Sequence, residues 1–147
     1  MPNKALLEKM NVYLANQQIS FVKLHNLHWY VNGKAFFTLH AKFEELYDHT
    51  ADVIDDVAER MLAIGGKPVA SFAKALEIAT IKELDDEFIS SDAAVEKLVT
   101  DIQWWIKDSK ELVSLAEEAG DHPTADMFIG YLAEYQKTLW MLKAYLA

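Results

Sequence analysis

One stretch of the sequence, residues 24–68, concentrates side chains that bind metal ions. It holds four of the five histidines of the chain together with a run of carboxylates. Imidazole and carboxylate groups form the ligand set that suits iron, zinc and manganese. The candidate ligands in this stretch are His28, His40, Asp55 and Glu59. Their spacing decides whether one folded chain can assemble a metal site from them.

The carboxylates and the histidines form two separate pairs. Asp55 and Glu59 are four positions apart, so a helix places them on one face, about 6 Å apart along its axis, where they can hold a cation. The same acidic run also fits an ordinary solvated helix face. His28 and His40 flank a short loop, and we expect them at the same end of the fold. A lone helical histidine is also common as a packed or surface residue.

The elements that must position these residues are predicted to be helices. Apolar residues recur mostly at steps of three, four or seven in residues 3–31, with Asn3 as the N-cap, and this pattern predicts a helix with one buried face. The predicted buried face consists of Leu6, Met10, Tyr13, Leu14, Phe21 and Leu24. A second helix is predicted from residues 36–38 to Gly65-Gly66, with Phe43, Leu46, Val53, Ile54, Val57 and Met61 on its buried face.

Two more long helices are predicted in the second half of the chain. One begins near Ser91, a candidate N-cap, and ends at Gly120; the other begins around residues 121–123 and runs nearly to Ala147. Short loops make each pair of helices antiparallel. The long connection over residues 67–90 contains SFAKALEIA, which predicts a short helix. The sequence therefore predicts a single all-α domain over residues 1–147, a ferritin-like four-helix bundle with a short helix in the long crossover.

Distance along the second helix separates the two pairs of candidate ligands. His40 and Asp55 are 15 positions apart, which is roughly 22 Å along a helix axis. Metal–ligand bonds are about 2 Å long, so these residues cannot share a metal within one chain. The Glu-x-x-His step of a di-iron site inside one bundle is also absent from the sequence. Either the chain has two separate weak half-sites, or a two-fold dimer brings the halves together.

Composition excludes several other classes of protein. The chain has no cysteine, which excludes disulfides, iron–sulfur clusters and thiolate metal sites. The formal net charge of −9 disfavours non-specific DNA binding and is compatible with collecting cations, although ordinary soluble acidic proteins have such a charge too. No apolar run approaches the roughly 18 residues of a membrane span, and the N-terminus lacks the pattern of a signal peptide. We expect a cytoplasmic protein with no membrane partner.

The stretch around the candidate ligands resembles the Dps family of miniferritins. The family pattern has the form HW, then F-x-x-LH, then D-x-x-x-E. It is supplied here by His28-Trp29, by Phe36 or Phe37 with Leu39-His40, and by Asp55 with Glu59. The resemblance is specific through the first two predicted helices and extends over the whole chain, including the GDHPTADMF start of the last helix.

The resemblance implies a hollow homododecamer built from two-fold dimers, with iron bound at sites between subunits. His28 and His40 match the imidazole ligands of one subunit, and Asp55 and Glu59 match the carboxylate ligands of its partner. Glu44 lies where a carboxylate for a second metal, or one supporting the ligands, is expected. The implied function is a ferroxidase that oxidises Fe(II), preferably with hydrogen peroxide and more slowly with oxygen, and stores ferric mineral. No organic cofactor is expected.

Three further residues match family positions beside or away from the iron site. Trp29 matches a tryptophan next to the site, where it is either oxidised in place of more vulnerable targets or anchors the dimer contact. Asp121 and Asp126 resemble the acidic residues that line the pore through which iron enters. Acidic residues near a helix N-terminus are also favoured by the helix dipole, so both aspartates have an alternative structural role.

The chain departs from the family in the basic tails that many members use to bind DNA. Only MPNK precedes the first predicted helix, and the chain stops at Ala147, at the end of the last. We therefore expect no direct DNA binding near neutral pH. The alternative function is a DNA-compacting shell with little catalysis. A helical scaffold without metal chemistry is a third possibility, but it does not explain the match at His28, His40, Asp55 and Glu59.

Overall fold

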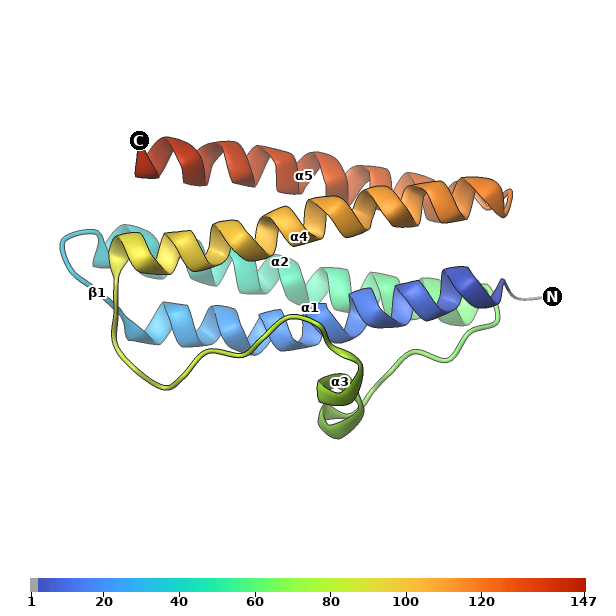
Figure 1. Ribbon diagram of the computed structural model, residues 1–147, viewed down its shortest axis with the longest axis horizontal. Helices are drawn as coiled ribbons and strands as arrows, with labels where there is room; N and C mark the ends of the chain where they lie inside the picture. The colour runs from blue at the N-terminus through green and yellow to red at the C-terminus, as the bar shows by residue number, and fades with distance from the viewer. Residues whose placement is uncertain (1–2) are drawn as a thin grey trace.

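Four long helices form a bundle in the computed structural model, which describes residues 3–147. They run side by side along the long axis of the molecule (Figure 1), as α1 (Lys4–Tyr30), α2 (Phe36–Ala63), α4 (Ser91–Glu118) and α5 (His122–Leu146). A short helix, α3 (Phe72–Ile78), lies in the connection between α2 and α4. The predicted all-α, ferritin-like four-helix bundle with a short crossover helix is confirmed. The first two residues of the MPNK segment lie outside the described part of the chain.

Polar side chains cap three of the long helices at their N-termini. The Asn3 side chain accepts a hydrogen bond from the backbone N of Leu6 at 2.9 Å, as the sequence predicts for this cap. The prediction that Ser91 caps α4 is wrong, because the cap is Ser90, which accepts from the backbone N of Ala93 at 3.3 Å. Pairing of Ser90 with β1 holds its backbone extended, so Ser90 is the cap and the helix begins at Ser91, one residue earlier than a Ser91 cap would place it.

A two-residue parallel strand pair, which the sequence pattern does not predict, closes one end of the bundle. β1 (Val31–Asn32) follows α1, and β2 (Ile89–Ser90) precedes α4, with Val31 opposite Ile89 and Asn32 opposite Ser90. Gly33 then has a φ of 111°, in the region that favours glycine, and turns the chain into α2. The pair therefore fixes the end of the bundle where α1 passes into α2.

Aromatic side chains fill the centre of the bundle. The fully buried Tyr13 ring meets Trp105 and Phe128 edge to face, with ring centroids 4.9 Å and 5.1 Å away. Most of the predicted buried faces of α1 and α2 are buried, but Phe21 of α1 and both Leu46 and Ile54 of α2 are only partly so. No helix in residues 3–147 is both long enough and apolar enough to cross a membrane.

The crossover is held against α1 by side-chain amides that satisfy its backbone. The fully buried Asn16 accepts hydrogen bonds from the backbone N of Thr80 and of Ile81, at 2.8 Å and 2.9 Å. Asn11 accepts from the backbone N of Val69 at 2.8 Å, and Gln18 donates to the Val69 carbonyl at 2.9 Å. Because a loop buried on a helix must pair its backbone groups, these amides fix the path of the crossover along α1.

Candidate metal centre

His28 and His40 lie together at the end of the bundle where α1 passes into α2. Their imidazole rings stack with centroids 3.6 Å apart and planes inclined by 13°. Nδ1 of His28 lies 2.6 Å from the carbonyl oxygen of His40, and Nδ1 of His40 lies 2.8 Å from the carbonyl oxygen of His28. Since a carbonyl only accepts, each Nδ1 carries the hydrogen. In the neutral form of each ring, the lone pair that can bind a metal ion is therefore on Nε2.

Glu44 completes the group at this end, one helical turn after His40. Its Oε1 lies 3.8 Å from Nε2 of His28 and accepts a hydrogen bond of 3.2 Å from the Tyr47 hydroxyl. Partial burial and the neighbouring Glu44 carboxylate raise the pKa of Tyr47, which keeps this hydroxyl a donor. The carboxylate is mostly exposed, so the group opens outward. His28, His40 and Glu44 form what we call the imidazole half-site.

Asp55 and Glu59 form a carboxylate half-site on the same helix but far from the histidines. Both side chains are exposed. A hydrogen bond shared with Asp55, the charge of Asp55, partial desolvation and the charge of Asp56 together raise the pKa of Glu59. A bound cation would relieve this repulsion. Because α2 is one continuous helix, His40 and Asp55 lie roughly 22 Å apart along it.

The structure therefore brings His28 together with His40, and Asp55 together with Glu59. It does not bring the two pairs together within one chain. No group of three or more histidine and acidic side chains in residues 3–147 is arranged to hold a metal ion. Neither half-site is a complete site by itself. This arrangement is what the distance argument from the sequence predicts for a single chain.

Aromatic residues surround the imidazole half-site. Trp29 is 64% exposed, although it follows the buried His28. The His25 ring lies 5.4 Å from the Trp29 ring and stacks on the Tyr47 ring at 3.8 Å. Tyr47 is not among the residues that the sequence pattern singles out. It lies seven positions after His40 and three after Glu44, so helical periodicity was the signal that could have indicated it.

Asp121 and Asp126, the predicted pore residues, differ in their surroundings. Asp121 caps α5, accepting from the backbone N of Thr124 at 3.1 Å, and pairs with Arg60 at 2.9 Å. Burial raises its pKa, but the hydrogen bonds from Thr124 and the Arg60 guanidinium outweigh burial and hold the pKa of Asp121 below its usual value. Asp126 is exposed on α5. Asp121 thus has the structural role of a helix cap. Lining of the pore remains a prediction for both aspartates.

Comparison with known proteins gives matches over nearly the whole chain. The family model for the ferritin-like domain matches residues 7–147. DNA protection during starvation protein 2 of Bacillus anthracis is 43% identical over 144 residues, with 98% of each chain covered. A Dps protein from Bacillus brevis has a solved structure that matches with a TM-score of 0.94 and 43% identity, over 98% of this chain and 96% of that one.

A third match carries a chemical description. The solved structure is a Dps protein from Vibrio cholerae O1, described as a member of a broad superfamily of ferritin-like diiron-carboxylate proteins. It matches with a TM-score of 0.93 and 35% identity, over 98% of this chain and 90% of that one.

Proposed function

The chain belongs to the Dps group of the ferritin-like family, and from this premise we propose that it is a ferroxidase that stores iron. It oxidises Fe(II), preferably with hydrogen peroxide and more slowly with oxygen, and keeps the ferric mineral in a hollow homododecamer. The activity protects the cell against oxidative damage. The observation that carries this proposal is the pair of reciprocal hydrogen bonds between the Nδ1 atoms and backbone carbonyls of His28 and His40, which leaves both Nε2 atoms free for iron.

The two half-sites act together across a two-fold contact between subunits. His28 and His40 bind Fe(II) through Nε2, and Glu44 adds a carboxylate beside them. Asp55 of the partner subunit and Glu59 of the partner subunit supply the remaining oxygens. Carboxylate oxygens favour the ferric state, so binding of the partner's carboxylates makes it easier for Fe(II) to lose an electron. A pair of ferrous ions each gives one electron to hydrogen peroxide, whose oxygens take up protons and leave as water.

The two-fold symmetry of the contact explains how one chain can carry both halves. In an isologous dimer the same patch of each subunit contacts that of the other. If the imidazole half-site of one subunit lies against the carboxylate half-site of its partner, symmetry therefore places the remaining two half-sites together in an equivalent second site. The exposed Trp29 beside the imidazole half-site fits such a contact, either as an anchor or as an oxidisable side chain. Iron is the substrate, no organic cofactor is needed, and the cytoplasm is the expected location.

The alternative is a DNA-compacting shell with little catalysis. The name of the Bacillus anthracis relative, which refers to DNA protection, favours it. The net charge of −9 counts against it, because DNA affinity depends on lysine and arginine neutralising phosphates. We therefore keep iron oxidation as the function.

The test of iron oxidation measures how fast ferric product forms in protein that has been loaded with Fe(II) without oxygen. Purified protein receives Fe(II) without oxygen and then hydrogen peroxide, and the absorbance of the ferric product is recorded. A His28→Ala/Asp55→Ala double variant should oxidise iron at least about tenfold more slowly, because one ligand is lost from each half. Assembly, measured by size-exclusion chromatography with light scattering, should not change.

A matched control removes one imidazole and one carboxylate elsewhere. His122 and Asp86 are both exposed and lie in other segments, so a His122→Ala/Asp86→Ala variant should oxidise iron at the rate of the unmodified chain. If the His28→Ala/Asp55→Ala variant also kept that rate, the assignment of the site would be wrong.

A further inference from the structure

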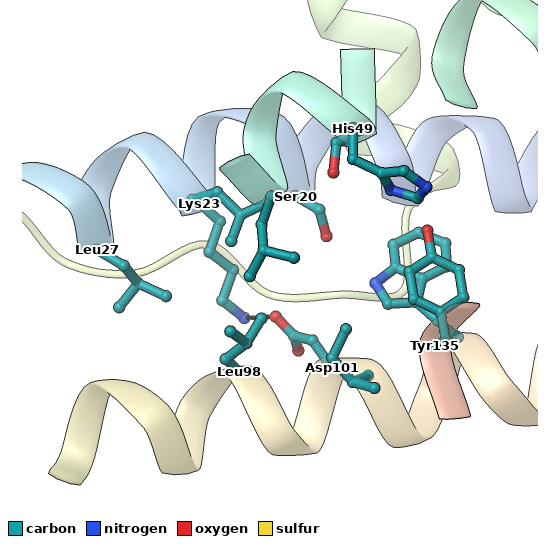
Figure 2. Close-up of a pocket in the computed structure, with 12 residues that line it drawn as sticks. Ser20, Lys23, Leu27, His49, Leu98, Asp101 and Tyr135 are labelled. Carbon is teal, nitrogen blue, oxygen red and sulfur yellow. Dashed lines mark ion pairs between the residues drawn. The ribbon is translucent and has the colours of Figure 1, made fainter. Parts of the chain in front are cut away.

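A small cavity lies inside the bundle between α1, α2 and α4, with a side chain of α5 at its edge (Figure 2). Its volume is about 20 Å³, which is enough for a water molecule. Apolar residues such as Leu27 and Leu98 line part of it, but Lys23, Asp101 and His49 bring polar groups to it. A cavity with a mixed lining of this kind is suited to water, whereas a purely apolar one stays dry.

Ser20 indicates that the cavity is hydrated. Its side chain is 5% exposed and lines the cavity, yet its Oγ has no hydrogen-bond partner among residues 3–147. A buried hydroxyl without a partner is unfavourable, and nearly all buried polar groups in proteins are paired. The equally buried Thr50 adds a second hydroxyl to the lining. A water molecule in the cavity would give Ser20 its missing partner.

An ion pair lines both this cavity and a groove on the surface of the bundle. Nζ of Lys23 lies 2.8 Å from Oδ2 of Asp101, and the two side chains are 9% and 14% exposed. Figure 2 shows them pointing toward one another from α1 and α4. The groove has a volume of about 460 Å³ and is also lined by residues 80–84 of the crossover and by Lys97 and Thr100. Burial raises the pKa of Asp101, and the charges of Lys23 and Lys97 oppose this.

The opposite side of the cavity leads to the other face of the bundle. His49 of α2 lines the cavity and is one-third exposed. Its Nε2 lies 2.7 Å from Oε2 of Glu134, an exposed residue of α5. The groove borders α1 and α4, whereas this pair joins α2 and α5. Polar groups of the cavity lining therefore lie toward both faces, Lys23 and Asp101 toward the groove of α1 and α4 and His49 toward α5.

We propose that the cavity binds a water molecule and that this water and the Lys23–Asp101 pair form a passage for water and protons through the bundle. Ser20 holds the water. A proton that enters at the His49–Glu134 pair passes to the water, and a proton of that water passes on to Asp101 and into the groove. Each proton that enters is matched by one that leaves, so the groups return to their starting states. The passage works in both directions.

The use of this passage rests on the proposed function. Ferric ion that enters a mineral hydrolyses water and releases protons, which must leave a closed shell. In a shell that separates the α1/α4 face from the α2/α5 face, the passage would supply such a route in every subunit. The passage itself is a property of the folded chain and can be tested without iron, so its failure and the failure of iron oxidation are distinguishable.

The test measures how solvent reaches Trp105, which lines the cavity and is 3% exposed. Raman spectroscopy follows exchange of its indole hydrogen in deuterated water, and a Trp105→Phe variant identifies the signal. A Lys23→Met/Asp101→Leu variant replaces the ion pair with apolar side chains, which buried pairs often tolerate without loss of stability. It should slow exchange by about twofold or more, since the entrance from the groove is closed while the entrance beside His49 and the fold remain.

The matched control is the other lysine–aspartate pair between α1 and α4. Lys9 and Asp108 lie 3.0 Å apart and do not line the cavity, so Lys9→Met/Asp108→Leu should leave exchange of the Trp105 signal unchanged. Equal exchange in the unmodified and Lys23→Met/Asp101→Leu proteins, or equal slowing in both double variants, would overturn the passage. A crystal structure should show a water bonded to Ser20 Oγ, and a dry cavity would also overturn the proposal.

Discussion

At the scale of single residues, the imidazole half-site is prepared before any metal arrives. His28 and His40 orient one another through their backbone carbonyls, and each carbonyl fixes the tautomer that a metal ion requires. The carboxylate half-site is prepared differently. Asp55 and Glu59 stay in repulsion until a cation or a proton relieves it, and the raised pKa of Glu59 records that cost.

This repulsion predicts that removing one carboxylate of the half-site makes the iron-free chain more stable while it weakens metal binding. Glu59→Gln removes a negative charge beside Asp55, so the iron-free variant should melt at a higher temperature at neutral pH. A raised pKa of an acid means that ionisation opposes folding above that pKa. The advantage of the variant should therefore shrink as the pH falls through the raised pKa, and vanish below about 4, where both chains carry a neutral side chain.

The measurement is a thermal melt at a series of pH values, with Glu45→Gln as the control. Glu45 is also an exposed glutamate of α2, but it lies next to Lys42, at 3.2 Å. Its replacement should not raise the melting temperature. A Glu59→Gln variant that melts below the unmodified chain at neutral pH would contradict the repulsion.

At the scale of the elements, the helices are positioned by polar side chains at their ends and along α1. Asn3, Ser90 and Asp121 define where three long helices begin, and Asn16 defines where the crossover lies. Asp121 has the largest set of partners among the caps, because it bonds Thr124 and also pairs with Arg60 from α2. It therefore joins the start of α5 to the end of α2.

Loss of this cap should destabilise the chain in a pH-dependent way. Asp121→Ala removes the cap and should lower the free energy of unfolding by about 1 kcal/mol at neutral pH. The lowered pKa means that the ionised Asp121 stabilises the fold above its ordinary pKa, about 3.9. The difference between variant and unmodified chain should diminish as the pH falls through the lowered folded-state pKa.

Asn3→Ala is the matched control, since it removes the N-cap of α1 without removing a titrating group. The free energy of unfolding of both variants and of the unmodified chain is measured with a denaturant at a series of acidic pH values, at one protein concentration. The cost of Asn3→Ala should not follow the titration of an aspartate. Equal pH profiles for the two variants would show that Asp121 acts only as a neutral cap.

At the scale of the whole molecule, separation of the two half-sites predicts complementation between inactive chains. His28→Ala and Asp55→Ala subunits, dissociated and reassembled in equal amounts, should form some dimers with one intact site. With random pairing, about a quarter of all sites regain both halves. The ferroxidase assay should recover in proportion.

The controls are the same variants reassembled separately and the double variant reassembled alone, and each should keep its slowed rate of iron oxidation. Recovery requires that subunits exchange, which mass spectrometry of isotope-labelled mixtures establishes independently. Exchange of subunits without recovery of iron oxidation would refute the shared site.

The charge of the molecule yields a second prediction at this scale. With a net charge of −9 per chain, the protein should not retard plasmid DNA in a gel near neutral pH and physiological salt. A chain extended at its N-terminus by a lysine-rich segment serves as the positive control. A clear shift by the unmodified protein would favour the DNA-compacting alternative.

The sequence by itself determined the helices and the separation of the ligands. Helical periodicity, end signals and loop lengths are local, and the 15 positions between His40 and Asp55 exclude a shared metal in one chain whatever the packing. The N-cap of α4 was misplaced by one residue because two adjacent serines are equivalent until Ser90 pairs with Asn32.

Only the tertiary structure decided which distant residues meet. The stacking of His28 on His40 depends on how the α1–α2 turn sets the register of two helices, and the placement of Tyr47 against His25 depends on the same register. The Lys23–Asp101 pair joins residues far apart in the sequence across the bundle core. Such contacts depend on the relative rotation of packed helices, which side-chain interlocking sets and no local pattern records.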